Sequence, residues 1–278
     1  MKKTPLFQEY DTLSRMNRLP LDIPLHISKN LNQNFSVRNY QQQAFARFLD
    51  YNNPVNPLKN KPVHLLFNMA TGSGKTFVMA WLILELYEKW YRNFLFFVNS
   101  SNIIEKTKEN FLNSNSSKYL FSEKIEFDGN IVDIREVDNF SSDGWESLNI
   151  KFTTIQWLHS DLNAVKENAL SYDDFERDKI VMLSDEAHHI NATTKKGKLG
   201  VNEAKEKTSW EQTIMKILAS HSENILLEFT ATIDLANELI AEKYRDKIIY
   251  KYDLSEFRMD WYSKEVDILK ADMPQKQR

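Results

Sequence analysis

The sequence predicts an α/β protein built on a mainly parallel sheet. Short, continuously apolar runs rich in β-branched and aromatic residues recur along the chain, which is typical of strands buried on both faces. These runs are VHLLFN (63–68), FLFFVN (94–99), IKFTTI (150–155), IVMLS (180–184) and ILLEFTA (225–231). Segments with helical apolar spacing follow them, so each strand is expected to lead into a helix that crosses one face of the sheet. The expected helices are 75–90, 102–113, 156–167, 209–219 and 234–241.

Composition excludes several classes of protein. Lys and Arg total 36 against 39 Asp and Glu, a net charge of −3, so the chain is not a generally basic nucleic-acid binder. Because it has no cysteine, disulfide scaffolds, thiolate zinc sites and cysteine nucleophiles are also excluded. The longest uncharged apolar run, Thr76 to Leu84, is far shorter than the roughly 20 residues of a membrane span. We therefore expect a cytoplasmic protein with no membrane role.

Three regions are expected along the chain. Residues 1–36 contain Pro5, Pro20 and Pro24 and predict an N-terminal arm or short helices packed against a domain. The main domain is expected over 37–255 and opens with an amphipathic helix over 38–49. Polar residues 191–207 predict an exposed loop within it. Residues 256–278 are expected to form a linker.

The segment Met69–Thr76 reads MATGSGKT and stands between an expected strand and an expected helix. This context is the one a phosphate-binding loop requires. Glycines let the backbone approach phosphates, and amide N–H groups at a helix N-terminus meet the negative charge. In that interpretation Lys75 reaches the terminal phosphates and the Thr76 hydroxyl binds magnesium. A glycine-rich turn without function is the alternative, since Met69 stands where the strict motif has its first glycine.

A second candidate site follows the strand 180–184, where Asp185 and Glu186 stand side by side. Open α/β sheets bind ligands at the carboxyl ends of their strands. In P-loop proteins such an Asp holds magnesium, and a neighbouring carboxylate can deprotonate the attacking water. Capping of the next helix would also suit two acids here. Together with the loop, they predict a site for nucleotide phosphates and magnesium.

These segments resemble motifs I, II and III of superfamily 2 helicases, in the right order: Met69–Thr76, Asp185-Glu186-Ala187-His188 and Thr230-Ala231-Thr232. More narrowly, the chain resembles the Res subunit of type III restriction enzymes. The residues supporting this are Arg38-x-Tyr40-Gln41, His188-His189 followed by Ile190-Asn191-Ala192, and Ser209-Trp210-Glu211-x-Thr213. The resemblance implies a RecA-like P-loop NTPase lobe, a three-layer sandwich, acting as the motor of a DNA-dependent ATPase.

The resemblance also implies residue roles. Lys75, Asp185 and Glu186 are the implied catalytic residues, and Thr76 and Asp185 the implied magnesium ligands. The implied nucleotide-binding residues are Arg38, Gln41, Thr71, Gly72, Ser73, Gly74, Lys75 and Thr76. His188, Thr230 and Thr232 would couple nucleotide state to movement of nucleic acid. The implied nucleic-acid contacts are Asn99, Ser100, Ser101, Thr153 and Thr154, although helix capping and β-propensity account for the same residue types.

The family's second lobe carries an arginine finger in a Gly-Arg motif, and no glycine here precedes an arginine. We therefore expect the second lobe and the nuclease domain to be absent and turnover by this chain alone to be slow. Duplex DNA, those missing domains and a modification (methyltransferase) subunit are the implied partners. The alternative function is a nucleotide-dependent DNA- or partner-binding module without turnover. A P-loop kinase or GTPase is disfavoured.

Overall fold

The computed structural model describes residues 4–140, 146–163, 170–187 and 201–262. Its centre is a seven-stranded sheet in the order β5-β6-β2-β7-β8-β1-β9, in which neighbouring strands pair in parallel. The strands of this sheet are β1 (Val63–Met69), β2 (Asn93–Val98), β5 (Ile134–Glu136), β6 (Leu148–Thr154), β7 (Ile180–Ser184), β8 (Ile225–Thr230) and β9 (Ile248–Tyr252). A small antiparallel hairpin consists of β3 (Ile125–Phe127) and β4 (Asn130–Val132).

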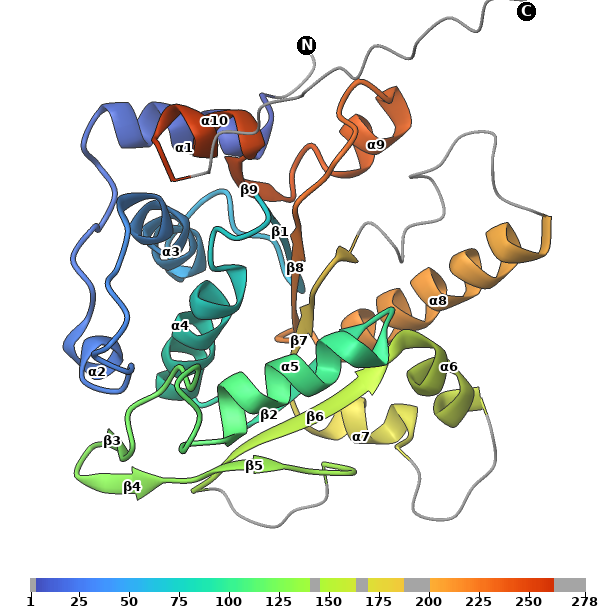
Figure 1. Cartoon of the computed structure of the whole chain (residues 1–278). Helices are drawn as coiled ribbons and strands as arrows, with labels where there is room; N and C mark the ends of the chain where they lie inside the picture. Colours follow the sequence, from blue (N-terminus) through green and yellow to red (C-terminus); the bar gives the residue numbers. More distant parts are fainter. Residues whose placement is uncertain (1–3, 141–145, 164–169, 188–200, 263–278) are drawn as a thin grey trace, which may run out of the picture.

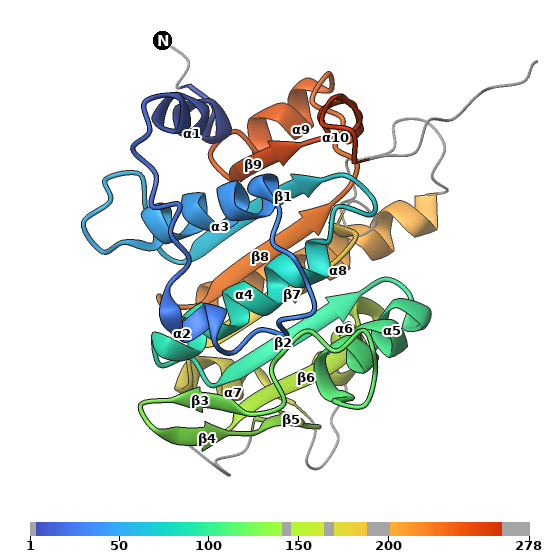
Figure 2. The ribbon, with the colours of Figure 1, turned by 60° about the vertical axis from the view of Figure 1, so that its left-hand side comes forward.

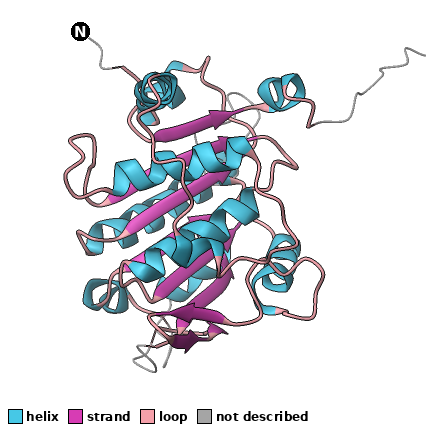
Figure 3. Cartoon of the chain, turned by 90° about the vertical axis from the view of Figure 1, so that its left-hand side faces the viewer, coloured by secondary structure: helices cyan, strands magenta, loops and turns pink. Residues whose placement is uncertain are grey.

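Helices cover both faces of the sheet (Figures 1 and 3). They are α1 (Leu6–Arg15), α2 (Leu25–Ser28), α3 (Asn39–Asn52), α4 (Lys75–Glu88), α5 (Ser101–Leu112), α6 (Ile155–Asn163), α7 (Tyr172–Arg177), α8 (Val201–Ser220), α9 (Glu238–Lys243) and α10 (Leu254–Met259). In Figure 1, α3 and α4 lie to the left of the sheet and α6 and α8 to the right. The predicted α/β class with a mainly parallel sheet is confirmed.

The strands are buried on both faces because their apolar side chains alternate between two cores. On β2, Phe94 and Phe96 pack in the core beneath α3, α4 and α5, whereas Leu95 and Phe97 pack beneath α6, α7 and α8. A strand that serves two cores has no polar face, so its sequence is a continuous apolar run. All five predicted strands occur for this reason, as β1, β2, β6, β7 and β8.

Other elements were not predicted. The run IIYKY forms β9 at the sheet edge beside β1, and its β-branched and aromatic residues were a usable signal. The turn Asp128-Gly129 joins β3 to β4, with both residues at positive φ, as Asp-Gly hairpins require. In contrast, β5 consists of partly or fully exposed residues and had no apolar signal.

Two expected boundaries are wrong. The loop expected over 191–207 ends too late, because α8 already begins at Val201; residues 188–200 lie outside the described part of the chain. Ala, Glu and Lys are good helix formers, so polarity there did not mean a loop. The helix expected over 234–241 begins only at Glu238, because the Asn237 side chain caps it by accepting a 3.1 Å hydrogen bond from the Leu239 N–H.

Helix α1 packs on the edge strand β9 and on α3 (Figure 2). Leu6 and Tyr10 of α1 are buried in the core beneath α3 and α4. The buried Arg47 of α3 joins three elements, since its guanidinium donates to the Phe7 carbonyl at 3.4 Å, to Asp11 at 2.8 Å and to the Ile249 carbonyl of β9 at 3.3 Å. The division of the chain into an arm (1–36), a main domain (37–255) and a linker (256–278) remains a proposal.

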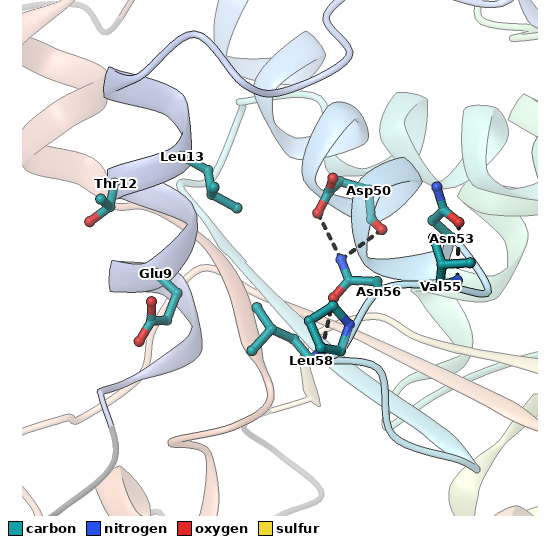
Figure 4. Close-up of a pocket in the computed structure, with 9 residues that line it drawn as sticks. Glu9, Thr12, Leu13, Asp50, Asn53, Val55, Asn56 and Leu58 are labelled. Carbon is teal, nitrogen blue, oxygen red and sulfur yellow. Dashed lines mark hydrogen bonds between the residues drawn. The ribbon is translucent and has the colours of Figure 1, made fainter.

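A surface groove of about 460 Å³ separates α1 from the loop after α3. At its wall the Asn56 amide points at Asp50 and donates to the Asp50 carbonyl and carboxylate, both at 2.8 Å (Figure 4). The Tyr10 hydroxyl donates to the same carboxylate at 2.9 Å. In the described residues no helix is long and apolar enough to cross a membrane.

Candidate nucleotide site

The loop of the MATGSGKT motif links the end of β1 to the start of α4. Gly72 and Gly74 both adopt φ +81°, a conformation that side chains disfavour. Gly74 is the N-cap residue of α4, and the Phe77 N–H donates to its carbonyl at 2.9 Å. This geometry leaves the first amides of α4 facing the loop, which is the arrangement that binds anions at helix N-termini. Thr71 and Gly72 are exposed, whereas Ser73 and Lys75 are buried.

Lys75 lies between this loop and the acidic pair. Its Nζ donates to the Met69 carbonyl at 3.4 Å and stands 4.0 Å from Glu186 Oε1. The acids follow β7, which is separated from β1 only by β8, so the three strands end at one edge of the sheet. Loop, lysine and acids, far apart in sequence, therefore share one site.

The two acids have different surroundings. Asp185 is only 9% exposed, and burial raises its pKa to about 6, with Lys75 opposing and the neighbouring Glu186 adding to the effect. The Glu186 N–H donates to Asp185 Oδ1 at 3.0 Å, and Glu186 itself adopts φ +53°. Positive φ at a residue other than glycine is strained, and such strain clusters at functional sites.

Tyr40 and Gln41 at the start of α3 contact the loop directly. The Tyr40 hydroxyl and the Gln41 Nε2 both donate to the Ser73 carbonyl at 2.9 Å. The Gln41 Oε1 accepts from the Arg38 N–H at 3.1 Å. A Cβ added to Gly74 would lie 2.5 Å from Gln41 Nε2, so the Gln41 amide would have to move to make room for any side chain there. Tyr40 was not predicted as a site residue, and its position directly before Gln41 was the only signal.

The predicted coupling residues lie beside the site. Thr230 ends β8, and its hydroxyl donates to the Thr232 carbonyl at 2.9 Å while accepting from the Thr232 N–H at 3.2 Å. The Asn68 side chain of β1 donates to the Thr230 carbonyl at 3.3 Å, which ties this turn to the strand that leads into the loop. His188 lies outside the described residues.

The predicted nucleic-acid residues gather at the ends of β2 and β6. Ser100 and Ser101 are exposed at the start of α5. Thr153 and Thr154 are buried, and their hydroxyls make local hydrogen bonds. The Thr153 hydroxyl donates to the Thr154 carbonyl, and the Thr154 hydroxyl accepts from the Trp157 N–H, both at 3.2 Å. Asn99 accepts a 2.6 Å hydrogen bond from Gln156, which joins the two strand ends. Gln156 was not predicted, because a contact between the first turn of α6 and the residue after β2 has no sequence pattern.

The residues at this site fit a nucleotide and magnesium. The Ser73 Oγ is buried and has no hydrogen-bond partner among the described residues, as expected of a hydroxyl in a loop shaped for a further polar group. Asp185 and Thr76 offer hard oxygen ligands, and magnesium is usually held by one or two carboxylates together with phosphates. A parallel sheet with this loop and acidic pair at its carboxyl edge has the features of a RecA-like P-loop NTPase.

Comparison with known proteins specifies the family. Residues 34–235 match the profile of "Type III restriction enzyme, res subunit". The chain is 42% identical over 279 aligned positions to the probable type III restriction-modification enzyme HindVIP Res subunit of Haemophilus influenzae, with 92% of this chain and 53% of that protein covered. The chain therefore belongs to the type III restriction enzyme res subunit family. It spans about half the length of this relative.

Two solved structures are similar in part. The UvsW helicase from bacteriophage T4 is 13% identical, covers 88% of this chain and 67% of its own, and has a TM-score of 0.47. A nuclease-deletion mutant of the Type ISP restriction-modification enzyme LlaGI, in complex with a DNA substrate mimic, is 16% identical, covers 81% and 20%, and has a TM-score of 0.44.

Proposed function

We propose that this chain is the ATP-binding and ATP-hydrolysing lobe of a DNA-dependent translocase. The position of Lys75 supports this most directly, since its ammonium lies between the phosphate-binding loop and Glu186, beside the buried Asp185. This arrangement combines donors for phosphate with a carboxylate that can accept a proton, as phosphoryl transfer to water requires.

In this proposal the amides of residues 72–76 and the Lys75 ammonium bind the phosphates. Thr76 and Asp185 hold magnesium, which when bound neutralises charge on the phosphate oxygens. Glu186, nearer to solvent than Asp185, orients the attacking water and takes its proton. The strained backbone at Glu186 fixes the direction of this carboxylate.

Nucleic acid is proposed to lie across the ends of β2 and β6. Exposed hydroxyls and amides at the start of α5, from Ser100 and Ser101, would contact phosphates there without positive charge. Asn99, Thr153 and Thr154 would shape this edge, while Thr230 and Thr232, with His188, would link it to the nucleotide. Duplex DNA, a second RecA-like lobe, a nuclease domain and a modification subunit are the proposed partners, in the cytoplasm.

Phosphate release from ATP, with and without duplex DNA, tests this proposal. We expect magnesium-dependent turnover that DNA stimulates. Glu186→Gln should keep ATP binding and remove turnover, whereas Lys75→Ala should weaken ATP binding itself. Lys89→Ala, at the opposite end of the same helix, is the matched control and should behave as wild type. Unchanged ATP affinity in Lys75→Ala would contradict the phosphate site.

The same experiment separates the alternative. ATP binding that depends on Lys75, with phosphate release no faster than in Glu186→Gln, would indicate a nucleotide-dependent binding module. DNA binding by that protein, measured with and without ATP, would then identify the module's partner.

A further inference from the structure

The amino ends of four neighbouring strands carry charged side chains. In the order of the strands across the sheet, Lys61 precedes β1, Glu223 precedes β8, Lys179 precedes β7 and Arg92 precedes β2. Because these strands are parallel, the four residues share the edge opposite to the nucleotide site. Lys59 lies close enough to Lys61 for their charges to interact. The four cations, Lys59, Lys61, Arg92 and Lys179, are called the basic edge below.

The cations of the basic edge repel one another. Lys61 Nζ lies 2.7 Å and Lys179 Nζ 3.9 Å from a carboxylate that they share, that of Glu223. Burial lowers the pKa of both Lys59 and Lys179, and other cations of the basic edge lower it further, although Glu223 opposes this. A further anion would relieve the repulsion. In a chain of net charge −3, the basic edge is therefore a local site for an anionic partner.

Capping of helix ends accounts for part of this charge. Arg92 Nη1 donates at 2.7 Å to a carbonyl in the last turn of α4, and Lys59 Nζ donates at 2.7 Å to the carbonyl of the last residue of α3. Lys61 differs, because its side chain is 55% exposed and pairs with Glu223. An ammonium has three donors, so a lysine that caps a helix can still meet an anion.

Trp90 follows α4 in a conformation that suits glycine. The Tyr91 N–H donates to the Leu86 carbonyl and the Trp90 N–H to the Tyr87 carbonyl, both at 3.0 Å, which is a Schellman motif. The left-handed position of this motif is usually glycine, and Trp90 occupies it with φ +66°. Trp90 is nevertheless 73% exposed, so burial does not compensate for the strain. Strain that packing does not explain points to a function.

Arg92 joins Trp90 to the basic edge. Its guanidinium lies over the Tyr87 ring at 3.8 Å and over the Trp90 ring at 5.1 Å from the ring centroids. The guanidinium thus lies against one face of the indole, and the exposure of Trp90 leaves the other face open. An aromatic ring beside several cations is the combination that binds single strands, because a base stacks on the ring while the cations meet the phosphates.

We propose that the basic edge and Trp90 bind single-stranded nucleic acid, with an unpaired base on the indole and phosphates at Lys61 and Lys179. A duplex fits less well, because the faces of its bases are already covered by stacked neighbours. A protein partner also fits less well, because lysine is depleted in protein–protein interfaces. This surface lies at the edge of the sheet opposite to the nucleic-acid contacts proposed at β2 and β6, and it goes beyond the proposed function.

Anisotropy of a labelled strand of about ten thymidines, measured without nucleotide, tests the proposal. Trp90→Gly removes the indole and supplies the residue that a Schellman motif favours. It should weaken strand binding at least about fivefold, while the midpoint of urea unfolding stays the same or rises. An abasic strand of equal length should bind wild type and Trp90→Gly equally. Unchanged affinity for the thymidine strand, or a lower urea midpoint, would overturn the proposal.

Trp261→Gly is the matched control. Trp261 follows α10 in the same motif, since the Tyr262 N–H donates to the Phe257 carbonyl at 3.2 Å, and it has φ +62° and is 84% exposed. Its neighbour in the chain is Asp260, not a cation. This variant relieves the same strain and should bind the strand as wild type does. A loss equal to that of Trp90→Gly would show that any exposed indole serves, against the proposed site.

Charge substitutions test the phosphate contacts. Lys61→Ala and Lys179→Ala should each weaken strand binding and reduce the slope of log affinity against log salt by about 0.7. Glu223→Gln removes a carboxylate that competes with phosphate, so it should bind the strand more tightly than wild type. Unchanged salt slopes in both lysine variants, or weaker binding by Glu223→Gln, would refute the contacts.

Competition separates the possible occupants. Unlabelled single strand should displace the labelled strand at lower concentration than duplex DNA of the same length or an oligomer of glutamate. Displacement at equal or lower concentration by duplex would assign the surface to duplex DNA, and by glutamate to an acidic protein, and either result would overturn the proposal. Because nucleotide is absent throughout, failure here leaves the proposed ATP site untouched, and failure of that site leaves this surface untouched.

Discussion

At Gly74, both the backbone conformation and the packing of Gln41 disfavour a side chain. Its φ of +81° disfavours any side chain, and an added Cβ would lie 2.5 Å from Gln41 Nε2. Gly129 has a similar φ of +83°, yet a Cβ there would meet nothing within 4 Å. Comparing substitutions at Gly74 and Gly129 therefore separates the cost of backbone strain from the cost of displacing Gln41.

We expect Gly129→Ala to cost about 1–2 kcal/mol of unfolding free energy, from positive φ alone, without affecting ATP binding. Gly74→Ala should cost more and should also weaken ATP binding, because Gln41 must leave the Ser73 carbonyl. Urea unfolding and ATP titration measure both effects. Equal costs and unchanged ATP affinity in Gly74→Ala would show that Gln41 moves aside freely.

The candidate site was predictable where it depends on local backbone shape. Glycines before a Lys-Thr pair between a strand and a helix specify the loop, and adjacent acids after a buried strand specify the second half of the site. The contacts that Arg38, Tyr40 and Gln41 make were not predictable. They form because α3 packs on the phosphate-binding loop and because the turn after α10 packs on α3. A contact between residues more than 200 positions apart, such as Arg38 and Tyr262, has no periodicity to reveal it.

Tyr10 gives a prediction for alkaline pH. Burial, followed by the hydrogen bond to Asp50, raises the pKa of the Tyr10 phenol above its ordinary value. The folded state therefore holds this proton more firmly than the unfolded state. The stability from Tyr10 is fully present below about pH 10, the ordinary value, and is lost as pH rises toward the folded-state pKa.

Tyr10→Phe should lower the unfolding free energy at pH 7 by about 1 kcal/mol, because the hydrogen bond to Asp50 is lost. Above pH 10 its stability should fall less steeply than that of wild type, by up to about 1.4 kcal/mol per pH unit. Urea unfolding at a series of pH values measures the two slopes. Parallel curves would show that Tyr10 does not titrate abnormally.

At the scale of elements, Arg47 holds three of them together. Its guanidinium binds α1 through Phe7 and Asp11 and the edge strand β9 through Ile249, and it lies over the Tyr250 ring at 4.9 Å. Arg47→Ala should lower the unfolding free energy by about 1–3 kcal/mol, because it leaves the buried Ile249 carbonyl without its donor, whereas water can reach the part-exposed Asp11. Proteolysis should then cut first near α1.

A surface ion pair provides the control for Arg47. Lys61 and Glu223 lie 2.7 Å apart, but both side chains are about half exposed. Lys61→Ala should therefore cost less than about 1 kcal/mol. Similar losses in the two variants would show that α1 is held by its apolar contacts, from Leu6 and Tyr10, and not by Arg47.

Elements were predictable in proportion to their burial on both faces. The five central strands are continuous apolar runs because two cores surround them, whereas the exposed edge strand β5 has no such run. The start of α8 was misjudged because its polar residues suit a loop and a helix equally well by hydropathy, and only helix propensity separates the two.

At the scale of the whole molecule, the site brings together parts of the chain that are far apart in sequence. The loop follows β1, the acids follow β7, and Arg38 and Gln41 belong to the start of α3. A nucleotide bound by all of them binds only the folded chain, so it should stabilise the entire domain by RT ln(1 + [L]/Kd), about 2.7 kcal/mol at one hundred times Kd. We expect magnesium and ATP together to raise the thermal midpoint, and EDTA to reduce that gain.

The expected stabilisation has two controls with different meanings. Lys75→Ala should show little or no rise with ATP, because the phosphate contacts are lost. Tyr10→Phe, remote from the loop, should start from a lower midpoint and still gain as much unfolding free energy as wild type, because ligand binding and the α1 contacts are independent. An equal rise in Lys75→Ala would mean that ATP binds elsewhere on the fold. A smaller gain in Tyr10→Phe alone would instead show that docking of α1 on α3 controls the shape of the nucleotide site.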